Sequence, residues 1–311
     1  MVSKTFKNLD EQIVLLQEKG LVIDDIDYAK EILLRENYFF LSGYRHLFLK
    51  KDGSRKFIYG TNFRELYGMF NFDRQIRNIL FKNILIVENN LKSILSHVIS
   101  KNHGFKEQHY LNAEIFVKDH TKVRQINDLI RKMKRQINVN GKQHAATNHY
   151  INNYGYIPLW VVVKVLSFGI VGELYSILQK EDQEEIADIY GVSINDLVNY
   201  LPILANYRNL CAHEDLCFNN RTHKKIEATL YHDILNIPKN EENEYIYGVN
   251  DLFAIIIIMK NILKDEDFVM MLNEISYELN ILDGKLEVIE IDAVLDAMGF
   301  PKNYKDIARM N

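Results

Sequence analysis

The sequence predicts an all-α protein, and three observations carry that prediction. The chain has 311 residues but only 4 Pro and 14 Gly, too few breakers for a sandwich or barrel rich in turns. Apolar residues recur with the 3.6-residue period of a helix over long stretches. Hydrophobic residues make up 47% and charged residues 26%, which is ordinary for a globular protein and excludes a disordered or collagen-like chain.

The expected N-terminal helical region comprises residues 1–60. Helical spacing of apolar residues predicts a first helix over Leu9–Lys19, which a glycine ends, and a second over Tyr28–Asn37. The aromatic-rich segment Asn37–Tyr44 is expected to pack these helices onto the rest of the molecule. Lys51–Ser54 has the composition of a turn.

A central helical domain is expected over residues 61–237. It opens with one very long helix over Asn62–Ser100, because that stretch has no Pro, a single Gly and apolar residues at helical spacing. A basic amphipathic helix is predicted over Thr121–Ile137. A polar loop that contains histidine is expected to follow over Asn138–Tyr154.

Prolines mark the next two helices of this domain. A first-turn proline precedes a helix expected over Leu159–Leu166, which resumes over Ile170–Leu178. Pro202 is expected to start or kink a helix that runs to about Ala212. Trp160 is expected in the core, and a platform for base stacking is the alternative.

Residues 238–311 form an expected acidic C-terminal helical extension. Between Glu241 and Met298 the chain has fourteen acidic residues and three Lys. The segment Pro238–Asn243 is polar and charged, as a linker would be. Three helices are predicted in the extension, over Leu252–Leu263, Phe268–Leu279 and Asp292–Met298.

Positive charge concentrates ahead of that extension. Lys118–Lys142 holds eight Lys or Arg and two Asp, which is compatible with a polyanion partner, or simply with a solvated helix face. RNA is the polyanion that the motifs below favour. The candidate RNA-binding residues are Arg74, Arg77 and Lys92 on the long helix, and Lys122, Arg124, Arg131, Lys132, Lys134 and Arg135 on the basic one.

Composition predicts a cytoplasmic protein without a membrane partner. Ile157–Val163 and Leu252–Met259 are the longest apolar runs and fall short of a bilayer span, so both are expected to be buried helix. The first ten residues lack the apolar region of a signal peptide. Two Cys fit a reducing compartment.

No cofactor and no metal is predicted. The sequence has no P-loop, no Gly-x-Ser-x-Gly motif and no paired-carboxylate motif. Cys211, His213, Cys217 and His223 have a spacing that fits no usual zinc finger.

The strongest candidate for chemistry is the pair Arg208 and His213, with Asn209 beside them. Imidazole titrates near neutral pH and can move a proton to or from a ribose hydroxyl or a leaving oxygen. Guanidinium binds a phosphate through paired donors and offsets charge that develops on it. Such a pair can cleave RNA with the neighbouring 2′-hydroxyl as nucleophile; a purely structural role is the alternative.

Helical geometry constrains this pair. Five residues turn through about 500°, so Arg208 and His213 are roughly 140° apart on a continuous helix. They share no face unless the helix ends near Ala212. Asn209 and His213, four residues apart, do share one, so the amide can orient the imidazole. This separation favours a site that is assembled from two chains, so we expect a homodimer.

The motif Arg208-Asn209-x-x-x-His213 resembles the RNxxxH motif of the HEPN superfamily, and the chain is similar to abortive infection proteins of the AbiD/AbiF type. Further matching segments occur in family order over residues 9–220. They are Leu9–Ile13, Leu15–Leu16, Gly20–Leu21, Asn37–Tyr38, Leu41–Tyr44, Phe72–Arg77, Glu88–Lys92, Pro158–Trp160 and Leu166–Gly169.

The resemblance implies a HEPN-like helical bundle, phage defence or toxin–antitoxin biology, and a metal-independent endoribonuclease that acts as a dimer. It also implies an RNA partner, because related HEPN domains occur in type VI CRISPR effectors and some AbiF-type proteins accompany a small RNA. Lys92 stands where the family pattern has Arg. Glu88 and Lys92 are interpreted first as a helix ion pair and second as support for the site. A non-catalytic RNA-binding module and a helical scaffold for protein interactions remain alternatives.

Overall fold

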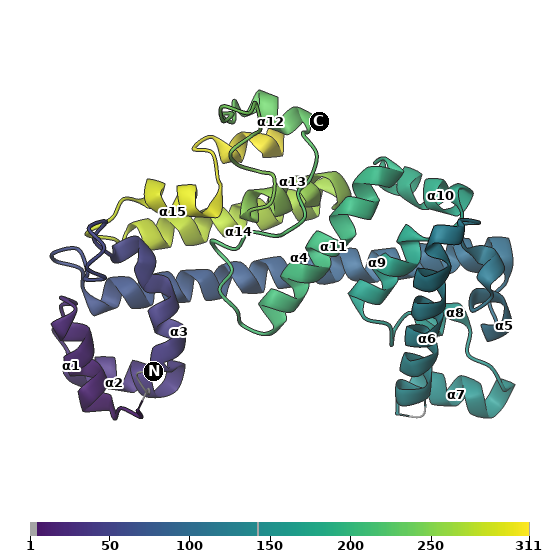
Figure 1. The fold of residues 1–311 in the computed structure, drawn as a ribbon, viewed down its shortest axis with the longest axis horizontal. Helices are drawn as coiled ribbons and strands as arrows, with labels where there is room; N and C mark the ends of the chain where they lie inside the picture. The colour runs from purple at the N-terminus through teal and green to yellow at the C-terminus, as the bar shows by residue number, and fades with distance from the viewer. Residues whose placement is uncertain (1–4, 142, 311) are drawn as a thin grey trace.

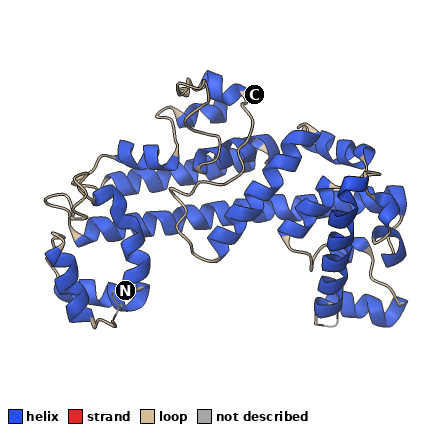
Figure 2. Cartoon of the chain, viewed as in Figure 1, coloured by secondary structure: helices blue, strands red, loops and turns tan. Residues whose placement is uncertain are grey.

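The computed structural model describes residues 5–141 and 143–310. The all-α prediction is confirmed: within this part of the chain the regular elements are helices, and β-pairing occurs only as isolated bridges (Figure 2). The helices are arranged along one central rod, α4, which spans Phe63–His103 (Figure 1).

α4 confirms the predicted long helix and extends three residues beyond it. Its 41 residues correspond to about 60 Å at 1.5 Å per residue. The side chain of Asn62 caps the helix by accepting a hydrogen bond from the backbone N–H of Glu65 at 2.8 Å. Gly104, with a φ of 98°, ends it, because a residue with a side chain adopts that backbone only under strain.

The N-terminal region has the two predicted helices, α1 (Leu9–Glu18) and α2 (Ile26–Glu36), followed by α3 (Tyr38–Ser42) and a 3₁₀ helix over Gly43–Phe48. The aromatic segment packs only in part. Leu41 and Tyr44 are buried, whereas Phe39 and Phe40 are 75% and 54% exposed. The segment therefore packs onto α4 through Tyr44, while its two phenylalanines stay exposed because α3 is a single short turn with one inward face.

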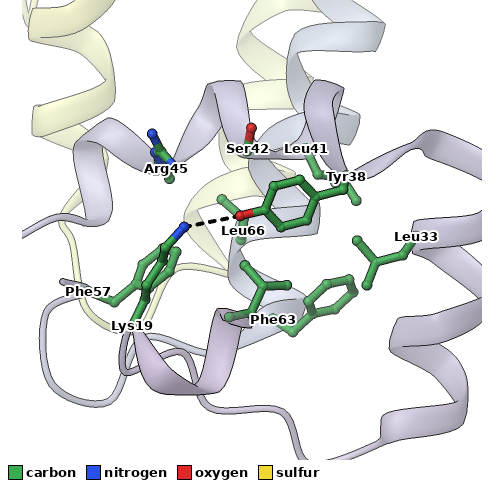
Figure 3. Close-up of a pocket in the computed structure, with 10 residues that line it drawn as sticks. Lys19, Leu33, Tyr38, Leu41, Ser42, Arg45, Phe57, Phe63 and Leu66 are labelled. Atoms are coloured by element: carbon green, nitrogen blue, oxygen red, sulfur yellow. Dashed lines mark hydrogen bonds between the residues drawn. The ribbon is translucent and has the colours of Figure 1, made fainter. Parts of the chain in front are cut away.

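A small pocket lies between α1, α2, α3 and the start of α4 (Figure 3). Its walls are mostly apolar and include Leu33, Phe57 and Phe63. At its rim the ammonium group of Lys19 donates a hydrogen bond to the hydroxyl of Tyr38 at 3.1 Å. This bond joins the end of α1 to α3.

The opposite end of α4 carries α5 (Glu107–Tyr110), α6 (Val123–Asn140), α7 (Ala145–Tyr154) and α8 (Leu159–Val162) (Figure 1). The prediction of a loop between the basic helix and Tyr154 is wrong, because α6 continues three residues beyond its predicted end and α7 is a helix. The cause is one buried side chain, since the hydroxyl of Thr147 donates to the carbonyl of Gly141 at 2.7 Å and fastens α7 to the end of α6. Lys142, which sequence analysis counted in the basic run, lies outside the described residues.

Trp160 corrects a second expectation. Its side chain is 45% exposed and lies outside the core. α8 is only four residues long, and Leu159 and Val162 fill its inward face. The indole instead lies beside the ring of Phe105, with 5.3 Å between ring centroids.

Three helices lead to the candidate site: α9 (Phe168–Ser176), α10 (Lys180–Tyr190) and α11 (Ile194–Ala212). Sequence analysis did not predict α10. α11 ends where expected but begins well before Pro202, which lies inside it. The true start is capped by Ser193, whose hydroxyl accepts from the backbone N–H of Asp196 at 3.0 Å.

The C-terminal extension contains α12 (Leu230–Ile234), α13 (Leu252–Ile262), α14 (Asp265–Asp283) and α15 (Ile291–Met298), and its last three helices match the prediction. α14 lies along α4 (Figure 1). The carboxylate of Glu65 on α4 accepts the backbone N–H groups of Glu287 and Val288, each at 2.9 Å. The extension thus packs on the central rod, and the expected domain boundaries stay predictions.

The expected linker Pro238–Asn243 folds back on itself, since the backbone N–H of Ile246 donates to the carbonyl of Pro238 at 3.0 Å. α13 is buried along nearly its whole length, as its apolar run predicted. Among the described residues, no helix combines the length and apolarity that a bilayer crossing requires.

Candidate active site

The last turns of α11 present two faces with different chemistry. Tyr207 and Cys211 point inward and are buried. Asn209 and His213 are both exposed, which confirms that the spacing of four residues places them on one side. No hydrogen bond between the amide of Asn209 and the imidazole of His213 occurs in the described chain, so the orienting role of Asn209 stays a prediction.

The helix end that holds His213 has a defined geometry. His213 caps α11, and its backbone N–H donates to the carbonyl of Asn209 at 3.0 Å. The N–H of Glu214 then bonds the carbonyl of Cys211, and that of Asp215 bonds the carbonyl of Leu210, which is the Schellman pattern. Glu214 has a φ of 57°, where glycine is usual, so the backbone next to His213 is strained.

Arg208 leans against the middle of α4. Its Nε donates to Oε2 of Glu88 at 3.4 Å, and its guanidinium carbon lies 5.6 Å from the ring centroid of Phe81. The other oxygen of Glu88 accepts from Nζ of Lys92 at 2.6 Å. The side chain of Arg208 keeps 34% of its surface exposed, so its remaining N–H groups stay open to a ligand.

Glu88 therefore combines the two roles that sequence analysis proposed for it. It forms the expected helix ion pair with Lys92, and it also contacts Arg208 from a different helix. Lys92 is almost fully buried in that pair. Its predicted contact with RNA does not fit this burial.

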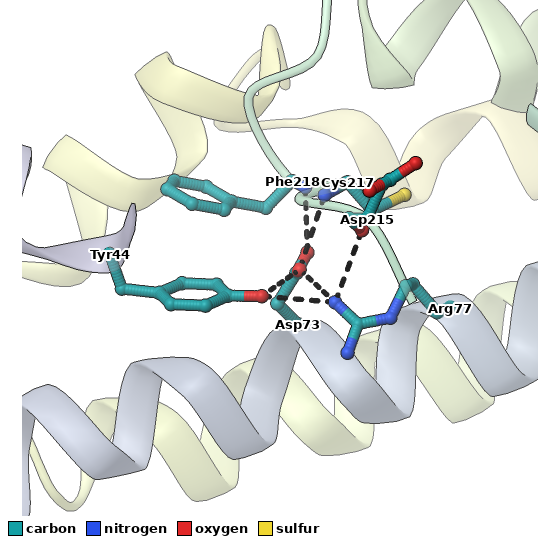
Figure 4. A network of polar contacts seen from close by, with 6 residues as sticks. All are labelled: Tyr44, Asp73, Arg77, Asp215, Cys217 and Phe218. Atoms are coloured by element: carbon teal, nitrogen blue, oxygen red, sulfur yellow. Dashed lines mark hydrogen bonds and ion pairs between the residues drawn. The ribbon is translucent and has the colours of Figure 1, made fainter. Parts of the chain in front are cut away.

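A buried polar cluster fixes the loop that follows His213 (Figure 4). Asp73 and Arg77 on α4 form an ion pair with almost no exposed surface. The carboxylate of Asp73 accepts the hydroxyl of Tyr44 at 2.6 Å and the backbone N–H groups of Cys217 and Phe218 at 3.1 and 2.7 Å. The chain on one side of His213 is thus fixed by α11 and on the other by α4.

The same cluster changes the interpretation of Arg77. Its side chain is only 3% exposed, and its guanidinium donates to the carbonyl of Asp215 at 3.4 Å as well as to Tyr44 at 3.0 Å. Burial raises the pKa of the Asp73 carboxyl, while the charge of Arg77 and the donated hydrogen bonds oppose that shift. Arg77 is placed to hold the loop, and its expected contact with RNA does not fit this position.

The other predicted RNA-binding residues lie nearer the surface. Arg74 forms an ion pair with Glu36 of α2 and keeps about a third of its side chain exposed. On α6, Arg131 pairs with Asp128 at 2.6 Å and Lys132 pairs with Glu173 at 2.7 Å. No ion pair within the described chain engages Lys122, Arg124, Lys134 or Arg135.

Sequence reasoning missed the part played by Asp73, Tyr44 and Phe81. Asp73 and Arg77 stand four residues apart in the Phe72–Arg77 segment, which is the spacing of a helix ion pair, so a signal for the pair was present. Nothing local links Phe81 or Tyr44 to residues more than a hundred positions further on.

The arrangement suits proton transfer next to a bound anion. His213 offers an exposed imidazole, and Arg208 offers unoccupied donors beside it in sequence. No group of three or more His, Cys, Asp or Glu suited to a metal ion occurs in the described ranges. Cys211 and Cys217 are buried thiols.

A comparison with protein-family models matches residues 31–219 to the model described as Abi-like protein. The match runs from α2 to the loop after α11 and includes Asp73, Glu88, Arg208 and His213. It ends before the acidic extension begins. Neither the curated proteins nor the solved structures gave a significant match.

Proposed function

This chain belongs to the Abi-like protein family, an abortive infection family that acts in phage defence, and from the site on α11 we propose that it is a metal-independent endoribonuclease of the HEPN type. The observation that supports this proposal is the placement of Arg208. Its guanidinium is held by Glu88 on one side and is open on the other, and the exposed imidazole of His213 follows five residues later in the chain.

In the proposed reaction, a ribose 2′-hydroxyl attacks the adjacent phosphorus. His213 acts as general base and takes the hydroxyl proton, or acts as general acid and protonates the departing 5′-oxygen. Arg208 binds the non-bridging oxygens and offsets the charge that grows on them. The products are a 2′,3′-cyclic phosphate and a free 5′-hydroxyl.

Glu88 acts in this proposal as a positioning residue. It accepts one N–H of Arg208 and so fixes the orientation in which the remaining donors meet a phosphate. Lys92 offsets part of the carboxylate charge, which would otherwise oppose an approaching phosphate.

We propose that the active form is a homodimer. One chain offers one Arg208 and one His213 on different sides of a helix end, and a two-fold axis near residues 208–213 would place a second pair opposite the first.

The alternative is a non-catalytic RNA-binding module, complexed with a cognate small RNA. The exposed face of α6 favours it, since Lys134 and Arg135 form no ion pair within the described chain and can contact phosphates whether or not His213 is catalytic.

Incubation of the pure protein with total RNA in EDTA tests the proposal. Cleavage that yields cyclic-phosphate ends supports the endoribonuclease. Tight, salt-sensitive binding without cleavage supports the module. If the protein neither cleaves nor binds RNA, a scaffold for protein interactions becomes the better description.

A further inference from the structure

At the end of the molecule that carries α5 to α8, five aromatic rings form a continuous row, in which Trp160 and Tyr154 are exposed and Phe105, Tyr156 and Tyr150 are half-buried. Successive ring centroids lie 5.3 Å apart for Trp160 and Phe105, 5.9 Å for Phe105 and Tyr156, 6.3 Å for Tyr156 and Tyr154, and 5.3 Å for Tyr154 and Tyr150. We call these five rings the aromatic platform. Tyr154 is 57% exposed, more than any of the other four rings.

Hydrogen bonds to the backbone fix the part of the platform that carries Phe105, Tyr156 and Trp160. The N–H of Leu159 donates to the carbonyl of Phe105 at 3.0 Å. Ile157 is held from both sides, since its N–H donates to the carboxylate of Glu107 at 2.6 Å and its carbonyl accepts the hydroxyl of Tyr110 at 2.9 Å. Ile157 directly follows Tyr156 in the chain and Leu159 directly precedes Trp160, so the rings of Phe105, Tyr156 and Trp160 are carried on backbone that is fixed before any ligand arrives.

The chain segment that carries most of the platform has an excess of positive charge. No Asp or Glu stands between Asp128 and Glu173, while six Lys and Arg do. That stretch covers most of α6 and all of α7 and α8. Nζ of Lys106 lies 4.6 Å from the ring centroid of Tyr156. The carboxylate of Glu107, on the neighbouring helix α5, is engaged by the backbone of Ile157.

We propose that the aromatic platform is a binding site for single-stranded RNA, whose bases stack on the rings while the lysines and arginines of this end contact the phosphates. Exposed rings together with nearby cations are the features that single strands use, because every unpaired base offers a face for stacking. A duplex keeps its base faces covered and gains nothing from the rings. This inference deepens the proposed function, since it names the form of RNA that the protein takes.

Trp160 is the sole tryptophan of the chain, so its fluorescence reports on the platform alone. The experiment uses the full chain with His213→Ala, in EDTA, so that no RNA is cut. Titration with a single-stranded oligouridine should quench the fluorescence, and an RNA duplex of equal length should not. Equal quenching by both, or by neither, would overturn the proposal.

The matched variants are all made in that background. Tyr154→Ala should weaken binding of the single strand by about 10- to 100-fold, the range expected for one lost base–ring stack. Tyr154→Phe keeps the ring and should bind like the parent. Tyr277→Ala removes a ring that is 64% exposed on α14 and serves as the control. Unchanged RNA binding by Tyr154→Ala would refute the platform.

The outcomes separate this inference from the proposed chemistry. If the platform binds single strands but the parent chain with His213 intact cleaves nothing, only the nuclease proposal fails. If the parent chain cleaves RNA, and Tyr154→Ala made separately in that parent chain binds and cleaves RNA as well as it does, only the platform fails.

Discussion

Glu88 and Arg208 are 120 residues apart in the chain, yet Oε2 of the first accepts Nε of the second at 3.4 Å. The contact joins the middle of α4 to the last turn of α11. The carboxylate is also shared with Lys92, so one buried acid balances two cations from two helices. Such a link orients the guanidinium of Arg208, while the carboxylate of Glu88 partly neutralises the positive charge that Arg208 presents to a ligand.

Glu88→Gln should lower both stability and cleavage. The substitution leaves the buried ammonium of Lys92 without its counter-charge, which costs about 3 kcal/mol in the free energy of unfolding. Cleavage should fall on the order of 10- to 100-fold, because Arg208 loses its fixed orientation. Denaturant titration and a gel assay of RNA cleavage measure the two effects.

The double variant Glu88→Gln/Lys92→Met separates these effects. It removes the unpaired ammonium and should recover most of the lost stability, while cleavage stays low. Recovery of cleavage together with stability would show that Glu88 acts only through the fold.

His213→Ala should abolish cleavage and leave the fold intact. The imidazole is exposed at a helix end and contributes proton transfer, worth about 10²- to 10⁴-fold in rate, and little packing. The thermal midpoint and RNA affinity should match the parent. His223→Ala, which removes another exposed imidazole, is the control and should cleave normally. A well-folded His213→Ala protein that cleaves at the parent rate would remove His213 from the mechanism.

Local signals predicted much of this fold. The long helix followed from the period of its apolar residues, and the glycine after Lys19 marked the end of α1. α7 escaped prediction because its stability depends on Thr147, a polar residue that is buried by tertiary contact. Trp160 was misplaced because periodicity does not reveal how short α8 is.

The candidate site divides in the same way. The spacing of Asn209 and His213, which is a local property, led to the expectation that they share one side of the helix. The burial of Arg77 could not be predicted in this way, because the acceptors that hold it include the carbonyl of Asp215, 138 residues away. The sequence of α4 alone does not distinguish a lysine or arginine that faces solvent from one that is buried against another segment of the chain.

The basic face of α6 should contribute to RNA affinity through charge. Replacement of Arg131, Lys132, Lys134 and Arg135 by Gln should weaken binding and flatten its dependence on salt. Each lost phosphate contact lowers the log–log slope by about 0.7 for single strands. The double variant Lys134→Gln/Arg135→Gln should account for most of the change, since Arg131 and Lys132 already pair with acids. A slope that stays constant in filter binding would identify this face as merely solvated.

Asp251 should make the stability of the extension depend on pH. Burial raises the pKa of its carboxyl from 3.8 to about 6. The native state therefore holds this proton more tightly than the unfolded chain, and the residue's contribution to stability is lost as pH rises from about 4 to 6. Asp251→Asn keeps an acceptor for the N–H of Ala254 but cannot titrate.

The comparison of the two proteins isolates that effect. Relative to Asp251→Asn, the parent should lose up to about 3 kcal/mol of unfolding free energy between pH 4 and pH 6, and nothing further above about pH 7. Denaturant titrations at several pH values give the difference. Parallel profiles for the two proteins would contradict the raised pKa.

Subunit mixing tests the proposed dimer. Arg208 and His213 lie on different sides of the end of α11, so one chain is poorly arranged to enclose a scissile phosphate. If each site takes Arg208 from one chain and His213 from the other, a mixture of inactive Arg208→Ala and His213→Ala subunits should regain partial cleavage, because each heterodimer contains one intact site. If each site needs both full pairs, the mixture stays inactive while the protein still sediments as a dimer. A protein that remains monomeric at nanomolar concentration and still cleaves RNA would refute both arrangements.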